Sequence, residues 1–101
     1  MWAQLISTRI KPGREADLPL LFGTLNSAEQ PDSGLLHTFG LQDQSDPGRA
    51  FVFVVFESEE KARARENDPR RAEGLAAARA LMAEIFDGPP EFVDLRVVHV
   101  A

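Results

Sequence analysis

The segment from Phe51 to Phe56 most constrains how this chain can fold, because all six of its residues are aromatic or β-branched. Such side chains favour a pleated strand over a helix, in which they lose rotamer freedom against the preceding turn. Successive side chains of a strand point to opposite faces, so apolar side chains lie on both faces of this one. The pattern therefore predicts a central strand that is covered on both sides.

The chain as a whole is short and acidic. Its 101 residues are 44% hydrophobic and carry a formal net charge of −5. This length predicts one domain, residues 1–101, and the scattered acidic charge argues against nucleic acid or an anionic membrane as a partner. The chain has no cysteine, which removes disulfides, thiol nucleophiles and thiolate metal sites and is compatible with a cytoplasmic protein. We expect neither a signal peptide nor a membrane span of roughly 20 apolar residues.

Three further segments have the pattern of strands. Residues 2–10 alternate loosely between apolar and polar and end at a Lys-Pro-Gly turn signal. Residues 35–42 predict a second strand, which the Asp-Pro-Gly turn within residues 43–48 joins to the central strand as a hairpin. Residues 92–100 predict a final strand.

The first helical region, residues 14–29, carries apolar side chains at helical spacing and has Pro19 near its start. A proline deep inside a helix would cost about 3 kcal/mol. Either Asp17 caps a helix that has Pro19 in its first turn, or a loose first turn precedes the helix. Firm helical order is therefore expected only from about Asp17.

The second helical region follows the central strand. Ser58 and the two glutamates after it predict the start of a short, solvated helix that extends to Glu66. Asp68 then predicts the cap of a longer helix with Pro69 in its first position. That helix has one apolar stripe and stops at a Gly-Pro-Pro sequence. The stripe consists of Leu75, Ala78, Met82 and Ile85.

The element order is thus β-α-β-β-α-β, which predicts an α+β, ferredoxin-like fold in which two helices cover one face of a four-stranded antiparallel sheet. The opposite face of the sheet, which carries Phe51, Phe53 and Val55, would be bare. Soluble monomers rarely expose an apolar face of several hundred Å². We therefore expect a homodimer in which two sheets face each other and close a dimeric α+β barrel.

Short motifs follow one another along nearly the whole chain in an order and spacing that resemble the antibiotic biosynthesis monooxygenase family. They are Pro12-Gly13-Arg14-Glu15, Gly34-Leu35-Leu36, Asp46-Pro47-Gly48-Arg49, Phe56-Glu57-Ser58, Asp68-Pro69 and Gly88-Pro89-Pro90. The resemblance implies a homodimeric barrel with a pocket between helices and sheet in each subunit. It also implies oxygenation of phenolic polyketides or quinols without flavin or metal, while one branch of the family degrades haem.

The chain departs from the family pattern at three positions. Many members have tryptophan where this chain has Phe56, and a histidine about nine residues later falls on Arg65. The asparagine that the haem-degrading branch uses in its first strand falls near Ile6. Haem degradation is therefore not expected, and no cofactor or metal is predicted.

Histidine is the side chain best suited to remove a proton from a phenol near neutral pH. The sequence has two, His37 and His99. His37 alternates in register with Leu35 and Phe39 in the second strand, so it is expected on the same apolar face. It is the candidate catalytic residue, which would deprotonate or orient a phenolic substrate bound against Phe56. A satisfied, partly buried structural histidine is the alternative. His99 is interpreted as structural or exposed, and the two have no metal-ligand spacing.

The resemblance implies that Phe56 faces the helices, as the family's tryptophan does, and the candidate substrate-binding residues follow from that facing. Besides Phe56 and Arg65, they are Val54, Phe22, Leu25, Met82 and Phe86. The alternative is an ordinary packed core. Arg65 and Asn67 could rim such a pocket or be solvated. Arg9 and Arg96 lie within strands, where interface salt bridges are the first hypothesis and an anionic ligand is the second.

Three classes of function stay open. The first is a small cofactor-independent monooxygenase whose partners are dioxygen and a small hydrophobic aromatic ligand of quinol or anthrone type. The second is an isomerase or a detoxifying enzyme on the same fold. The third is a non-catalytic, ligand-binding or stress-associated dimer. A closed apolar cavity reached by His37 would favour the first class, a polar cavity the second and a filled core the third.

Overall fold

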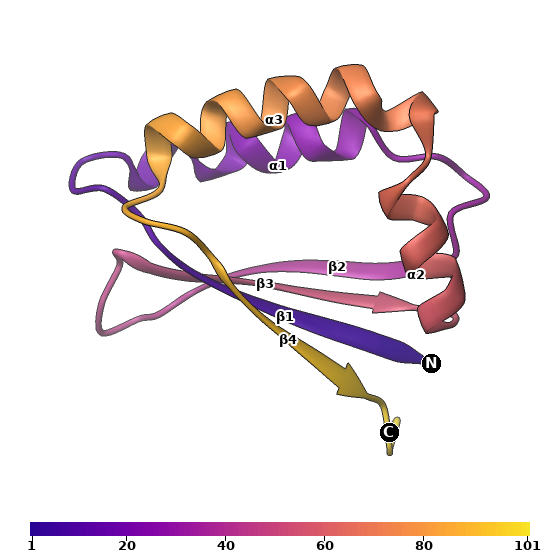
Figure 1. Ribbon diagram of the computed structural model, residues 1–101. Coiled ribbons are helices and arrows are strands. Elements are labelled where there is room, and N and C mark those ends of the chain that lie inside the picture. Colours follow the sequence, from indigo (N-terminus) through magenta and orange to yellow (C-terminus); the bar gives the residue numbers. More distant parts are fainter.

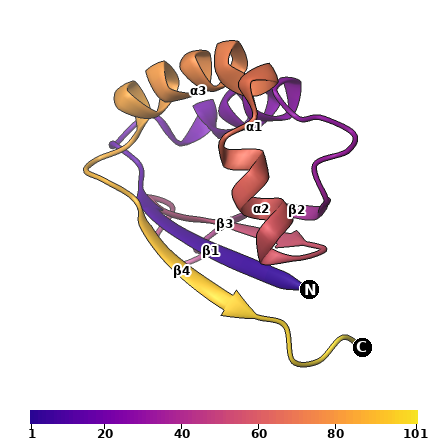
Figure 2. The same ribbon diagram turned by 45° about the vertical axis from the view of Figure 1, so that its right-hand side comes forward.

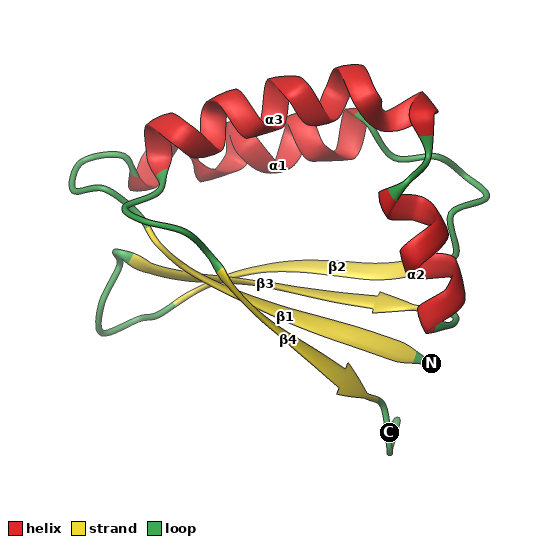
Figure 3. Ribbon diagram, in the orientation of Figure 1, coloured by secondary structure: helices red, strands yellow, loops and turns green.

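The computed structural model describes all 101 residues and contains one antiparallel sheet (Figure 3). The strands are β1 (Trp2–Arg9), β2 (Leu35–Gln42), β3 (Arg49–Phe56) and β4 (Glu91–Arg96), in the order β2-β3-β1-β4. The apolar strand β3 lies inside the sheet, between β2 and β1. The predicted α+β fold with a four-stranded antiparallel sheet is therefore confirmed.

The helices cover one face of this sheet. Helices α1 (Leu18–Ser27) and α3 (Ala72–Ile85) lie side by side above it, and the short α2 (Glu59–Glu66) stands at the end where β3 finishes (Figures 1 and 2). The 3₁₀ turns η1 (Glu15–Asp17) and η2 (Pro69–Arg71) lead into α1 and α3. The other face of the sheet carries no helix (Figure 1).

Local sequence accounts for where the helices begin. Ser58 accepts a hydrogen bond from the backbone N–H of Lys61 at 3.2 Å, and Asp68 accepts one from Arg70 at 2.9 Å, so both predicted caps are confirmed. Before α1 the alternative with a preliminary turn is the correct one. The Asp17 carboxylate makes no cap bond and instead pairs with Arg14 at 2.6 Å.

The strand register defines the two faces of the sheet. Directly opposite residues of an antiparallel pair point to the same side. Ile6 pairs with Val52 and with Phe92, and the cavity described below places all three on the helix side. Leu5 pairs with Phe53 and therefore lies on the open side.

A β-bulge at the start of β2 changes the predicted facing of that strand. Leu35 pairs with Phe56, whereas His37 pairs with the adjacent Val55, so Leu36 is an extra residue in the ladder. Leu35 consequently packs beneath the helices, and His37 and Phe39 lie on the open face. The expectation that Leu35 and His37 share one face is wrong for this reason.

Two groups of buried side chains hold the helices on the sheet. One joins α1 and α3 to the sheet and consists of Ile10, Leu21, Ala50, Ala78 and Ile85. The other lies under α2 and consists of Trp2, Val54, Phe56 and Ala62. Close approach of α1 and α3 depends on Gly74, because a Cβ there would lie 2.5 Å from the Cβ of Ala28.

One sequence expectation needs correction. The last strand ends at Arg96 and not at residue 100, because its pairing partner β1 begins at Trp2 and offers no further ladder. Arg9 pairs with Asp46 of its own chain at 2.7 Å, and an interface or ligand role for Arg9 and Arg96 stays a prediction. No helix has the length and apolar character needed to cross a membrane.

Candidate functional site

A cavity of about 170 Å³ lies between the helices and the covered face of the sheet. Its floor is apolar and includes Ile6, Val52 and Val54, and its roof includes Leu25 of α1 and Met82 of α3. Most of its lining is hydrophobic. A concave apolar site with a few polar groups is the usual form of a small-molecule site, so this cavity is the candidate functional site.

The ionisable groups of the cavity lie together. Glu29, Arg65 and Arg71 are the only ionisable residues in its wall. Arg65 donates to the Glu29 carboxylate from both Nε, at 2.9 Å, and Nη2, at 2.5 Å. The guanidinium of Arg65 also lies 5.3 Å from the ring centroid of Phe56, which is cation–π distance.

The Glu29–Arg65 pair is largely covered, with side-chain exposures of 23% and 18%. Partial burial acts to raise the pKa of Glu29, but hydrogen bonds from Arg65 and Ser33 outweigh it, so this pKa lies below its ordinary value. Glu29 is therefore ionised at neutral pH and is fully engaged with Arg65.

Arg71 is the most buried charged residue of the chain, with only 4% of its surface exposed. The one hydrogen bond of its side chain runs from Nη1 to the backbone carbonyl of Arg65 at 3.1 Å, and its Nε is buried without a partner. Burial, followed by the nearby positive charge of Arg65, lowers the pKa of Arg71. The cavity thus has a cationic group that the chain itself leaves incompletely satisfied.

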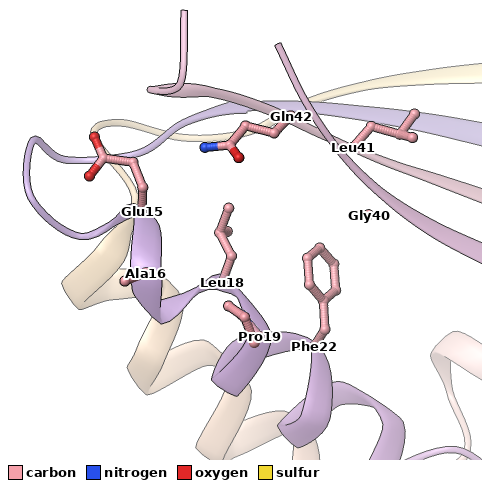
Figure 4. A pocket seen from close by; sticks show the side chains of 8 residues that line it. All are labelled: Glu15, Ala16, Leu18, Pro19, Phe22, Gly40, Leu41 and Gln42. Carbon is pink, nitrogen blue, oxygen red and sulfur yellow. The ribbon is translucent and has the colours of Figure 1, made fainter. Parts of the chain in front are cut away.

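A second, more open space of about 460 Å³ lies between the start of α1 and the end of β2 (Figure 4). We call it the outer groove. Its wall includes Leu18 and Pro19 on the helix side and Leu41 and Gln42 on the strand side. Phe22 lines both this groove and the interior cavity. Its ring extends from α1 toward the strand at Gly40 (Figure 4), so Phe22 separates the two spaces.

The structure brings together most of the residues predicted to bind substrate. Six of them line the cavity, namely Val54, Phe22, Leu25, Met82, Phe86 and Arg65. Phe56 does not line it and lies behind Arg65 in the group that also contains Trp2. That these residues bind a substrate stays a prediction.

The two histidines lie away from the cavity. His37 is exposed on the open face of the sheet, where its ring stacks on Phe39 with 5.9 Å between centroids. Phe56 points to the opposite, helix-covered side of the sheet. A single small ligand therefore cannot contact both His37 and Phe56. His99 follows the last strand and is exposed. No group of three acidic or histidine side chains is arranged to bind a metal.

Sequence reasoning missed Arg71 altogether, although the sequence does carry a signal. The helical stripe Leu75, Ala78, Met82 continues backwards by four residues to Arg71. An arginine on the buried stripe of a helix is unusual and needs a partner. The adjacent Arg70 lies outside the stripe and is exposed, pairing with Asp68 and Asp32.

Solved structures with the same fold include proteins of several descriptions. The NE2512 protein of unknown function from Nitrosomonas europaea is 24% identical, with a TM-score of 0.75 over 99% of this chain and 91% of that one. An antibiotic biosynthesis monooxygenase is 17% identical, with a TM-score of 0.72 over 98% and 100%. A MhuD mutant with two manganese protoporphyrin IX molecules bound per active site is 21% identical, with a TM-score of 0.74 over 100% and 98%.

No curated protein matches the chain. A family model described as antibiotic biosynthesis monooxygenase, however, matches residues 1–77. This match runs from β1 into the first turns of α3 and includes Glu29, Arg65 and Arg71 of the cavity wall. The resemblance inferred from the short motifs is confirmed, and the chain belongs to the antibiotic biosynthesis monooxygenase family.

Proposed function

We propose that this protein is a cofactor-independent monooxygenase that oxidises a single-ring phenol or quinol in the cavity between helices and sheet. One observation supports this function above the others: the cavity is mostly apolar, and its three charged side chains, Glu29, Arg65 and Arg71, lie together. An apolar wall suits an aromatic ring, and a charged group suits its hydroxyl group.

The volume of the cavity restricts the size of the ring system. A cavity of roughly 150 Å³ in another protein accommodates benzene, and this one measures about 170 Å³. A single substituted ring therefore fits without rearrangement. A fused three-ring anthrone would need Phe22 to move aside and open the cavity to the outer groove (Figure 4). Within the class of substrates expected from sequence, quinols are favoured over anthrones.

The proposed reaction needs no external reductant. Ionisation of a hydroxyl group gives an electron-rich anion, which transfers one electron to dioxygen and forms superoxide and a phenoxyl radical. These combine at a ring carbon that bears hydrogen. The O–O bond of the resulting hydroperoxide breaks, so that one oxygen leaves in water with that hydrogen and the other remains as a carbonyl. A dihydroxybenzene and dioxygen thus give a hydroxyquinone and water.

Haem does not fit the residues of this cavity. A porphyrin joins four pyrrole rings and greatly exceeds a space of about 170 Å³. The cavity wall contains no histidine to ligate iron. By the family resemblance, the asparagine of the haem-degrading branch falls near Ile6, and a histidine common in the family falls on Arg65. The porphyrin bound to the MhuD mutant is therefore not proposed as a ligand of this chain.

A second copy of the chain is proposed as the partner that covers the open face of the sheet. Phe39, Leu41 and Val93 on this face are each 48% exposed. Their neighbours Phe51 and Phe53 are only half-buried. An apolar face that continues across all four strands is typical of a permanent interface. Two-fold pairing of such faces would bury His37 between the sheets.

Oxygen uptake with hydroquinone tests the proposed function. We expect uptake that depends on both protein and quinol, with hydroxyquinone as the product and no bound metal or flavin. A two-ring naphthol and a three-ring anthrone serve as size controls and should react progressively more slowly. Binding of hydroquinone without uptake would instead establish the non-catalytic alternative. Absence of both would contradict the proposed site.

The predicted catalytic role of His37 is tested in the same assay. General-base catalysis typically contributes about 10²- to 10⁴-fold. A fall of that size in kcat for His37→Ala, with the dimer intact, would establish the role. Unchanged uptake would make this histidine a structural residue of the open face.

A further inference from the structure

We infer that Arg71 is a ligand-binding residue that anchors an anionic oxygen, a phenolate or a carboxylate, on the molecule that occupies the cavity. This inference shares its cavity with the proposed function but does not require that oxygenation occurs. It specifies the class of ligand as a single aromatic ring that carries one negative charge.

The first support is the incomplete hydrogen bonding of Arg71. A guanidinium has five N–H donors and no acceptor. Only one hydrogen bond is made here, from Nη1 to the carbonyl oxygen of Arg65, and Nε is buried without a partner. Since 96% of the residue surface is covered by the rest of the chain, bulk water cannot satisfy the remaining donors fully.

The second support is the absence of a carboxylate that belongs to Arg71. Glu29 is the only acidic residue in the cavity wall, and its carboxylate is taken by three hydrogen bonds from Arg65. Asp68 makes its hydrogen bonds with Arg70. The two arginines and one glutamate of the cavity therefore leave one unneutralised positive charge in a mostly apolar site. Buried charges are normally paired.

The third support is the position of this charge relative to the apolar wall. Arg71 shares the cavity with Leu25, Val54 and Met82, which offer surfaces for a flat ring. A ring packed against them can place one oxygen at the guanidinium, where charge-assisted hydrogen bonds are strongest. A cationic ligand would meet a like charge. A neutral ring would leave Arg71 unpaired.

This arrangement also provides a way to ionise the substrate. A phenol ordinarily ionises near pH 10, and an adjacent positive charge favours the anion. Arg71 would therefore stabilise the phenolate that reacts with dioxygen, with its proton released to solvent. No histidine is required within the cavity for that step.

Benzoate and benzamide provide the test, because they have nearly the same shape and differ in charge. We expect titration calorimetry of the parent protein to show benzoate binding about 10- to 100-fold more tightly, the effect of a hydrogen bond to a charged group. Arg71→Met keeps the length of the side chain without its charge and should abolish the preference. Arg71→Lys should retain part of it, and Arg70→Met, a change at the exposed neighbour, should retain all of it.

Equal affinity of the parent protein for the two ligands, binding of neither, or a preference that survives Arg71→Met would overturn the inference. If Arg71→Met fails to fold, the comparison of the parent with Arg71→Lys still decides the matter, since a charge without the guanidinium geometry must weaken benzoate more than benzamide. An Arg71-dependent preference without oxygen uptake would support the anchor and contradict only the oxygenase function. Oxygen uptake without a preference for benzoate would support the oxygenase function and contradict the role of Arg71 as an anchor.

Discussion

The ring of Phe22 lies directly against the backbone of Gly40. A Cβ built on this glycine would lie 2.6 Å from both Cε2 and Cζ of the ring, which is far inside normal van der Waals contact. The contact joins α1 to the edge strand β2 at the point where the outer groove and the interior cavity meet (Figure 4). Glycine at this position therefore determines where the ring of Phe22 can rest.

Gly40→Ala should destabilise the protein, since the new methyl group must displace the ring. Overpacking of this kind typically costs about 1–3 kcal/mol. Chemical denaturation of the variant measures the loss. Gly23→Ala is the matched control, because nothing lies within 4 Å of a Cβ at this exposed position of α1, and there alanine should stabilise by about 0.5–1 kcal/mol. Equal effects of the two changes would show that the ring moves freely.

Phe22→Ala should widen the range of ligands by joining the outer groove to the cavity. The parent protein should bind a single ring better than a naphthol, and the variant should reverse or remove this preference. Titration with phenol and naphthol measures the ratio of the two affinities. Leu20→Ala is the control, because Leu20 belongs to the same helix, is 60% exposed and lines neither space. A naphthol affinity that does not change in Phe22→Ala would mean that the two spaces are not separated by this ring.

Glu29→Gln should weaken the fold by leaving Arg65 without its carboxylate. Loss of hydrogen bonds to a partly buried charge typically costs about 1–3 kcal/mol. The exposed pair of Lys61 and Glu57 offers a control, because Glu57→Gln should change the free energy of unfolding by at most about 1 kcal/mol. Thermal or chemical denaturation compares the two variants. Similar small effects would show that burial adds nothing to the Glu29–Arg65 pair.

Acid should destabilise the protein as pH falls from about 4.5 toward 2. Side-chain and backbone hydrogen bonds from Arg70 lower the pKa of Asp68 from 3.8 to about 2, and the pKa of Glu29 lies below its ordinary 4.5. As pH falls, the unfolded chain therefore takes up protons before the folded one, so stability present above these ordinary values is lost below them. Denaturation midpoints measured across this range should fall.

The same series on Asp68→Asn identifies the responsible group. Asparagine can still cap the helix but cannot titrate, so the fall in stability with acid should be less steep than in the parent. Glu60→Gln changes an exposed glutamate that has no ion pair in the structure and should leave the slope as it was. An unchanged slope in Asp68→Asn would contradict the assignment.

Phe53→Asp should dissociate or unfold the proposed homodimer, because it places a charge in the middle of the open apolar face. Light scattering at micromolar concentration should give twice the 11.2 kDa chain mass for the parent and the monomer mass, or an unfolded chain, for the variant. Val98→Asp, at an 88% exposed residue beyond the last strand, should leave the dimer intact. A parent protein that is a stable monomer would contradict the proposed assembly.

Local patterns in the sequence were enough to establish the element order and the family. Caps such as Ser58 and Asp68 act on backbone groups within three residues, so they can be recognised without the fold. The apolar strand from Phe51 to Phe56 could occupy only the interior of a sheet, which is where it lies. Its period of two placed the even-numbered residues on one common face, and the family resemblance at Phe56 indicated that this face meets the helices.

Contacts between distant segments were decided only by the tertiary structure. One extra residue at Leu36 turned His37 to the open face, and a bulge of this kind depends on pairing with β3 and leaves no signal in β2 itself. Arg9 pairs with Asp46, and Arg65 pairs with Glu29, although 37 and 36 residues separate them along the chain. Arg71 lines the cavity because the apolar stripe of α3, which Arg71 extends, packs over the sheet. The sequence determined which side chains were available for chemistry, and packing determined which of them meet.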